Sequence, residues 1–255
     1  MPVTLTSRDG VALITLDRPE AMNALSFAII REIGDAIDAA CASEARALLF
    51  IGAGEKAFCA GADIKELRER PLMDQLQGAE LGQAIFAKLD AAPIASIALI
   101  NGFAFGGGLE LALACTFRIA APSAKVGLPE VKLGLIPGYG GTQRLPRLIG
   151  EGRALEMIMT ARTVEAEEAL RIGLVNQIAE GDLTAAGIAF AQRFTRFSLP
   201  SLRFARDAVR RAGDCALHEG LKVEADLSTL AYRTNDAEEG MAAFEEKRKP
   251  EFKDG

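Results

Sequence analysis

The sequence has very little histidine: His218 is the single one in the chain. Zinc sites built on several histidines are therefore excluded. A Ser-His-Asp or Cys-His triad would have to use His218, which lies in a helical stretch of mixed charge. We expect an ordinary helix-surface residue there instead. Acid–base chemistry must then fall on carboxylates, lysines or tyrosines.

Other absences narrow the class of protein further. Four scattered cysteines without a CxxC pair argue against a disulfide framework. No apolar run is long enough to span a membrane, and residues 91–100 are too few. The net charge of −6 and the pI near 5.1 argue against a nucleic-acid surface. The N-terminal segment has no signal or transit pattern, so we expect a cytoplasmic protein.

The hydrophobic content and the alternation of strand and helix patterns favour an α/β fold. The 255 residues are 49% hydrophobic, which is enough for a sizeable core. Short apolar strands, for example at 11–16, 47–51 and 94–100, alternate with amphipathic helical stretches. From about residue 183 the pattern is helical to the end. We therefore expect an α/β core over residues 1–195 and a helical region over residues 196–255.

One stretch, NGFAFGGGLELALACT at 101–116, combines three glycines with a carboxylate in an apolar helix. Glycines lack Cβ and let another molecule approach the backbone. A helix N-terminus behind them offers free N–H groups and a positive partial charge. The carboxylate, Glu110, has leucine and alanine neighbours and is not expected to face open water. This stretch predicts a binding or catalytic site.

A second small-residue stretch, AFCAGADI at 57–64, also allows close backbone approach. Two loops that each present one unhindered N–H can form an oxyanion hole. The alternative is a surface turn that needs Gly61 for its backbone angle. Taken together with the glycines at 106–108, the oxyanion hole is the preferred interpretation.

Glu110 and Glu130 are the candidate acid–base pair. Two carboxylates in one pocket have separated pKa values, so one can accept a proton while the other donates. The alternative interpretation of each glutamate is structural, because an acidic residue in the first turn of a helix interacts favourably with the helix dipole.

The loop GYGGTQR at 138–144 precedes a helix. We interpret it as a tight turn with Thr142 as N-cap, in preference to a phosphate-binding site. The GAGEKA run at 52–57 fits a relaxed dinucleotide fingerprint, but no helix follows it and the match is discounted.

The order and spacing of four motifs resemble the enoyl-CoA hydratase/isomerase (crotonase) superfamily. These motifs are FCAGADIKE at 58–66, NGFAFGGGLE at 101–110, GLPE at 127–130 and PGYGGTQR at 137–144. The resemblance runs to an EKRK-x-x-FKD tail at 246–254. It implies a spiral of repeated ββα turns, with C-terminal helices that pack homotrimers and often dimers of trimers.

The resemblance also implies site residues. The backbone N–H groups of Ala62 and Gly107 would form the oxyanion hole for a thioester carbonyl. Glu110 and Glu130 align with the catalytic glutamates, with Glu130 as main proton donor to C2 and Glu110 as water activator. The remaining substrate- and CoA-binding positions are Ala60, Asp63, Ile64, Lys65, Gly106, Tyr139 and the tail lysines Lys247 and Lys253.

The implied activity is hydration of a 2-enoyl-CoA in fatty-acid breakdown. Coenzyme A is then part of the substrate, and neither a separate cofactor nor a metal is expected. Alternatives are an isomerase, a branched methylglutaconyl-type hydratase, a hydratase-lyase, or a non-catalytic scaffold member. Some branched-acid hydratases bind RNA, but the acidic pI argues against that here. Phe105, Thr116 and Tyr139 depart from the usual pattern, and Phe105 and Tyr139 are expected to reshape the acyl pocket.

Overall fold

Two sheets form the centre of the first of two compact units in the computed structural model, which describes residues 1–255. The units are Met1–Ala189 and Phe190–Gly255. The large sheet has the order β1 (Val3–Arg8), β2 (Val11–Leu16), β3 (Ala47–Gly52), β5 (Ala95–Ile100), β7 (Phe117–Ala120) and β10 (Gln177–Ile178). The small sheet has the order β4 (Ala57–Cys59), β6 (Phe103–Phe105), β8 (Lys125–Gly127) and β9 (Val164–Glu165).

Strands alternate between the two sheets along the chain. Each of β3, β5 and β7 in the large sheet is followed by a strand of the small sheet, and then by helix. Within each sheet these successive strands pair in parallel, whereas β1–β2 and β8–β9 are antiparallel. This repeated ββα connection confirms the spiral expected from the resemblance.

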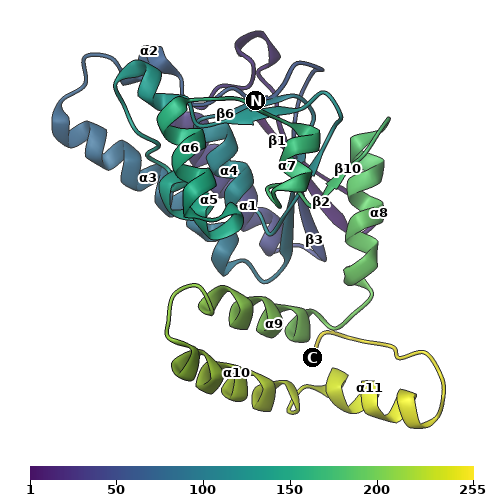
Figure 1. Ribbon diagram of the computed structural model, residues 1–255. Coiled ribbons are helices and arrows are strands. Elements are labelled where there is room, and N and C mark those ends of the chain that lie inside the picture. Colours follow the sequence, from purple (N-terminus) through teal and green to yellow (C-terminus); the bar gives the residue numbers. More distant parts are fainter. The chain divides into compact units, whose positions relative to one another are not determined.

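Helices cover the sheets and complete the chain (Figure 1). In the first unit, α3 contacts both α1 and α4 beside the strands. Their bounds, in chain order, are η1 (Pro19–Ala21), α1 (Phe27–Cys41), α2 (Ile64–Leu67), α3 (Leu72–Ala91), α4 (Gly107–Ala114), η2 (Glu130–Leu133), α5 (Gly141–Ile149), α6 (Glu151–Thr160), α7 (Ala166–Arg171), α8 (Leu183–Thr195), α9 (Leu199–Arg211), α10 (Leu217–Ala231) and α11 (Asn235–Glu245). No helix has both the length and the apolar character needed to cross a bilayer.

The core follows from the apolar strands. The strands β3 and β5 are buried along almost their whole length, because helices or strands cover both of their faces. The helix α1 buries a stripe that includes Ile30, Ile33 and Ile37, as its amphipathic spacing predicts. Ser26 before this stripe is a candidate N-cap in the sequence, and in the structure its hydroxyl does accept from the N–H of Ile29.

Some local expectations are wrong. The run before Pro71 predicts a helix over 64–70, but α2 ends at Leu67, and the pattern gives no sign of the three-residue strands β4 and β6. Thr142 does not cap α5: Gly140 precedes the helix in a left-handed conformation, with φ of 112°. Asn235 with Glu238 three residues later resembles a capping box, but the cap of α11 is Thr234, whose hydroxyl accepts from the N–H of Ala237. His218 lies on α10 with a side chain 75% exposed, as expected.

Asn23 locks the turn that precedes α1 to the segment around β4. Its side-chain nitrogen donates to the carbonyls of Ala53 (3.1 Å) and Ala57 (2.8 Å), and its oxygen accepts from the N–H of Arg18 (2.9 Å). Asn23 is 2% exposed and has a positive φ of 57°, which asparagine tolerates better than most residues. Its turn therefore holds the start of β4 by buried hydrogen bonds.

Replacing Asn23 by alanine should leave buried carbonyls unpaired and cost about 3 kcal/mol of unfolding free energy. For a chain of this size we expect the thermal midpoint to fall by about 6–12 °C. The exposed Asn235→Ala is the matched control and should stay within about 2 °C. Equal midpoints for the two variants, measured by circular dichroism, would contradict the assigned anchoring.

Candidate active site

The three chemistry-bearing segments each follow one strand of the small sheet. Ala60–Ala62 follow β4, Gly106 and Gly107 follow β6, and Leu128–Glu130 follow β8. The strands β4, β6 and β8 are adjacent and parallel, so their carboxyl ends lie at one edge. The structure thereby brings together three segments that are spread over residues 60–130 of the sequence.

Among the backbone N–H groups at this edge, those of Ala62 and Gly107 make no hydrogen bond to an acceptor within the chain. Their loops lie against each other, since a Cβ on Gly61 would be 3.6 Å from the nitrogen of Gly107. Around Ala62 the backbone is held in place, because the N–H of Leu25 donates to Gly61 (2.8 Å) and the N–H of Asp63 to Leu25 (2.8 Å). Two fixed donors without protein partners can stabilise an oxyanion.

The glycines before α4 are required by close packing. A Cβ on Gly108 would lie 2.1 Å from the carbonyl oxygen of Cys59, and Gly106 has a positive φ of 51°. Any side chain at these two positions would therefore displace α4 from the end of β4 or strain the turn. Because Gly106 and Gly108 have no side chains, the N-terminus of α4 can reach the edge of the small sheet.

Glu110 is 2% exposed on α4, all eight residues of which are buried. Its Oε1 accepts from the backbone N–H groups of Tyr139 (2.7 Å) and Gly141 (2.7 Å). The second carboxylate is Glu130 on η2. It lies beside Gly106, since a Cβ added to Gly106 would be 3.0 Å from its Oε1. Its Oε2 is buried and has no hydrogen-bond partner. Glu130 thus has an oxygen available for a substrate or water.

One cavity of about 500 Å³ joins these groups. The residues that line it include Ala60–Ala62, Gly106, Gly107, Glu110, Glu130 and Tyr139, with apolar side chains from α2, α3 and the loop after η2. Both carboxylates and both loops of the predicted oxyanion hole therefore face the same space. The predicted convergence of Glu110 with Glu130 is observed, although spacing in the sequence could not establish it.

Burial sets the proton affinity of both carboxyls. The pKa of Glu110 is raised to about 7, mainly by desolvation and also by the nearby charge of Glu130, while the N–H donors of Gly141 and Tyr139 oppose the shift. Desolvation also raises the pKa of Glu130. A pair of carboxyls with raised pKa values is able to exchange protons near neutral pH.

The loop that holds Glu110 is itself fixed to α3. The side-chain amide of Gln83 donates to the carbonyl of Gly138 (2.9 Å), and Arg144 donates to the carbonyl of Tyr139 (3.3 Å). Arg144 also pairs with Asp90 on α3 (2.9 Å). The sequence offered no signal for these supports, because Gln83 and Asp90 lie on an ordinary helical face.

The ring of Tyr139 fills the space between α3 and α4. A Cβ on Gly82 would lie 2.2 Å from one edge of the ring, and a Cβ on Gly107 would lie 3.1 Å from the opposite edge. Phe86 contacts the ring edge-on at a centroid distance of 5.8 Å. Tyr139 therefore forms part of the cavity wall, as expected, and two glycines make room for it.

Phe105 does not contribute to this wall, contrary to the expectation. Its ring stacks on Phe103, with centroids 5.6 Å apart, and lines a different cavity with Lys125 and Glu165. Alternation along β6 explains the error, since neighbouring side chains point to opposite faces of a strand. Thr116 has a structural contact instead: its hydroxyl accepts from the N–H of Ser96 (3.2 Å).

The remaining predicted binding residues are divided between cavities. Ala60 and Ile64 line the main cavity, whereas Asp63 and Lys65 line a neighbouring one of about 780 Å³. Asp63 also caps α2 and pairs with Arg18 (3.0 Å), so its carboxylate has a structural function.

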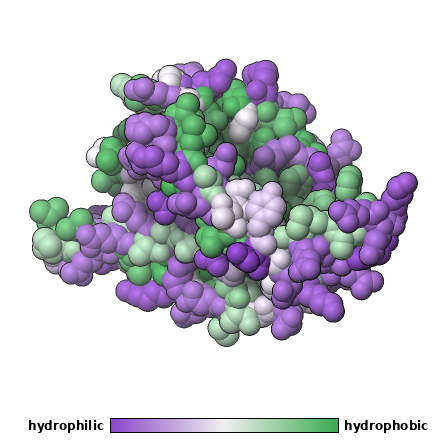
Figure 2. All heavy atoms as spheres, turned by 90° about the horizontal axis from the view of Figure 1, so that it is seen from below, coloured by the Kyte–Doolittle hydropathy of each residue, from purple (hydrophilic) through white to green (hydrophobic).

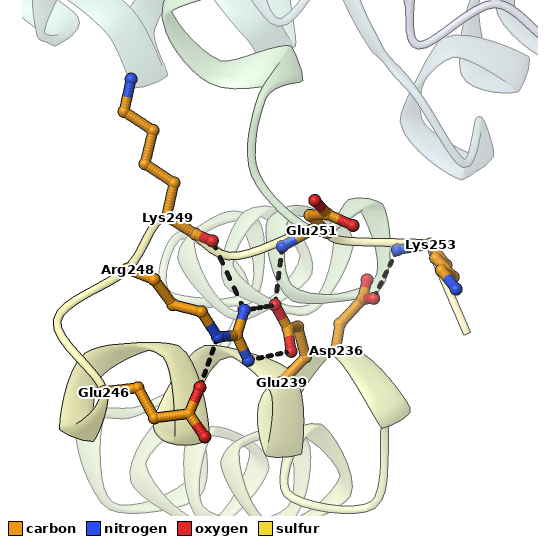
Figure 3. A network of polar contacts seen from close by, with 7 residues as sticks. All are labelled: Asp236, Glu239, Glu246, Arg248, Lys249, Glu251 and Lys253. Atoms are coloured by element: carbon orange, nitrogen blue, oxygen red, sulfur yellow. Dashed lines mark hydrogen bonds and ion pairs between the residues drawn. The ribbon is translucent and has the colours of Figure 1, made fainter.

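Lys247 and Lys253 belong to the C-terminal tail of the second unit, where Lys247 has an exposed side chain. Figure 3 shows how this tail is tied to α11. The buried carboxylate of Asp236 accepts from the N–H groups of Lys253 (2.7 Å) and Asp254 (3.0 Å), and Glu239 pairs with Arg248. These bonds fix the backbone of the tail and do not involve the side chains of Lys247 and Lys253.

Comparison with known proteins identifies the family of the chain. The profile of the family described as enoyl-CoA hydratase/isomerase matches residues 6–255. A crotonyl-CoA hydratase of Syntrophomonas wolfei is 41% identical over 252 residues, covering 98% of this chain and 97% of that protein. A short-chain-enoyl-CoA hydratase of Clostridium acetobutylicum is 39% identical over 251 residues, covering 98% and 96%.

A solved structure is equally similar. The crystal structure of an enoyl-CoA hydratase from Bacillus anthracis superposes with a TM-score of 0.94 at 38% identity, covering 100% of both chains. The chain belongs to the enoyl-CoA hydratase/isomerase family.

The raised pKa of Glu110 predicts a pH-dependent stability. A carboxyl with a folded-state pKa above its unfolded value stabilises the fold below the unfolded pKa, and this contribution is lost as the pH rises through the folded pKa. The pH window here lies between the ordinary glutamate pKa of 4.5 and about 7. Relative to Glu110→Gln, the wild type should lose about 2–3 kcal/mol of unfolding free energy across it.

Urea unfolding at several pH values measures this difference. The exposed Glu180→Gln is the control, and its difference from wild type should stay flat over the same range. A flat difference for Glu110→Gln as well would show that the carboxyl is not desolvated as described.

Proposed function

We propose that the protein is a 2-enoyl-CoA hydratase, which adds water across the 2,3 double bond of an enoyl-CoA thioester to give a 3-hydroxyacyl-CoA. The observation that carries this proposal is the single cavity faced by two carboxylates and two unpaired backbone N–H groups. A scaffold protein needs neither the two carboxylates nor the two N–H groups, and an isomerase needs only one carboxylate for its proton transfer.

The proposed chemistry assigns one task to each group. The N–H groups of Ala62 and Gly107 bind the thioester oxygen, which gains negative charge when water attacks C3. Removing one such donor from comparable sites costs about 3–4 kcal/mol of transition-state stabilisation. Glu110 accepts a proton from the attacking water, and Glu130 delivers a proton to C2. The two carboxyls exchange protons as a pair and titrate together.

For the substrate we propose a short enoyl chain. The aromatic side chains of Phe27 and Tyr139 close the cavity beside α3, where Gly78 and Gly82 accommodate them. The relatives named for crotonyl-CoA and short-chain enoyl-CoA support this choice. Coenzyme A would lie along Ala60, Asp63, Ile64 and Lys65, with the tail lysines as further phosphate contacts.

We also propose that the protein acts in the cytoplasm as a homotrimer or a dimer of trimers. Large apolar side chains are exposed on the helical unit, among them Leu217, Tyr232 and Phe244. The face drawn in Figure 2 likewise has apolar patches between hydrophilic side chains. Exposed apolar surface of this kind is typical of a protein–protein interface.

The two glutamates provide the test of the proposed activity. Wild type should consume crotonyl-CoA, followed as loss of the conjugated thioester absorbance. Glu110→Gln and Glu130→Gln should each lower kcat by about 10²–10⁴-fold, because each removes one proton transfer. Glu180→Gln is the control and should keep wild-type kcat. Full activity in either active-site variant would refute the two-carboxylate mechanism.

Tyr139 tests the proposed chain length. Tyr139→Ala should raise kcat/KM for a ten-carbon enoyl-CoA relative to crotonyl-CoA by about tenfold, because it opens space for further methylenes. Glu110 keeps its hydrogen bond, which comes from the backbone of residue 139. Tyr139→Phe is the matched control, and its ratio should stay near wild type. An unchanged ratio in Tyr139→Ala would place the end of the acyl pocket elsewhere.

A further inference from the structure

A buried arginine lies outside the catalytic cavity. Arg118 on β7 is 3% exposed, and its strand neighbours Ile119 and Ala120 are buried apolar residues. A charged side chain costs free energy when it is removed from water, so it is rarely buried without a counter-charge. An arginine in a short apolar strand is the sequence signal that could have identified it.

The hydrogen-bond partners of the Arg118 guanidinium are all backbone carbonyls. Its Nε donates to Leu174 (2.7 Å), and its Nη1 donates to Cys115 (2.8 Å) and Ala112 (3.4 Å). No carboxylate pairs with the guanidinium. Burial lowers the pKa of Arg118 to about 10, which still leaves it protonated at neutral pH. The structure therefore retains an uncompensated positive charge in its interior.

Two of these carbonyls are at the C-terminal end of α4. Ala112 lies in its last turn and Cys115 is its C-cap. A helix carries a partial negative charge at this end and a partial positive charge at its N-terminus, and a cation at the C-terminus neutralises the former. The other end of α4 begins with Gly107. An eight-residue helix is about 12 Å long.

The helix is buried along its whole length between the two ends. Every residue of α4 is buried, so the charge of Arg118 acts through protein rather than through water. Electrostatic interactions are stronger in such surroundings than in solvent. The positive end of α4 and the charge behind it both favour negative charge beside Gly107.

We propose that Arg118 is a positioning residue for the oxyanion hole: it fixes the C-terminal end of α4 and adds positive potential behind the N–H of Gly107. This inference rests on the proposed function, because it assumes that a thioester oxygen binds at Gly107. The arginine touches neither substrate nor cavity and acts through the helix.

Arg118→Lys and Arg118→Gln separate charge from structure. Both keep a donor for a carbonyl at the end of α4, but only lysine keeps the charge. Arg118→Gln should lower kcat for crotonyl-CoA by about tenfold with KM nearly unchanged, whereas Arg118→Lys should recover most of this loss. Arg162→Met is the matched control, since Arg162 pairs with Glu156 and Glu168 away from α4. Its kcat should equal that of wild type.

A spectroscopic readout makes the test independent of turnover. The carbonyl stretch of bound butyryl-CoA, which has no double bond to hydrate, reports polarisation at the oxyanion hole. We expect a downward shift in wild type and in Arg118→Lys, and a smaller shift in Arg118→Gln. All measurements are made below the thermal midpoint of each variant, so that loss of folded protein does not enter.

The outcomes distinguish the two proposals. If Arg118→Gln is less stable but has wild-type kcat and carbonyl shift, Arg118 is structural only and the inference is wrong. Equal losses in Arg118→Gln and Arg118→Lys would also overturn it, because the charge would then not matter. If wild type hydrates no enoyl-CoA, the proposed function fails, while the carbonyl shifts still decide whether Arg118 polarises a bound thioester.

Discussion

Parallel pairing of β4, β6 and β8 is the constraint on which the site depends. These strands have only three residues each, and yet they align the segments that carry Ala62, Gly107 and Glu130. Their alignment is maintained because each follows a longer, largely buried strand of the large sheet. The large sheet supplies the core, and the small sheet uses that rigidity to fix three loops at one edge.

Packing and chemistry are connected through α4. The helix is wholly buried, its first turn faces the cavity, and Glu110 projects from that turn against the loop of Tyr139 and Gly141. Burial raises the proton affinity of the carboxylate, while the two N–H donors hold its orientation. The same desolvation that costs stability gives a carboxyl with a pKa near neutral, which is useful for moving protons. Stability and activity are therefore opposed at this residue.

The anchoring of the Glu110 loop connects the catalytic pair with the wall of the cavity. Gln83 and Asp90 tie the loop to α3, and the ring of Tyr139 fills the gap between α3 and α4. An aromatic ring at this position requires the absence of side chains at Gly82 and Gly107. Residue size on α3 thus affects both the space for the acyl chain and the setting of a catalytic carboxylate.

The sequence by itself determined the α/β class, the strands and helices with strong periodicity, and the motifs that identify the family. It also determined which residue types carry out acid–base chemistry, since histidine is nearly absent. Only the tertiary structure decided that Glu110 and Glu130 share one cavity, that the ring of Phe105 lies outside it, and that Arg118 is buried at the end of α4. The reason is physical: strands of three residues have too few side chains to show a period, and burial depends on neighbours that are distant in the chain.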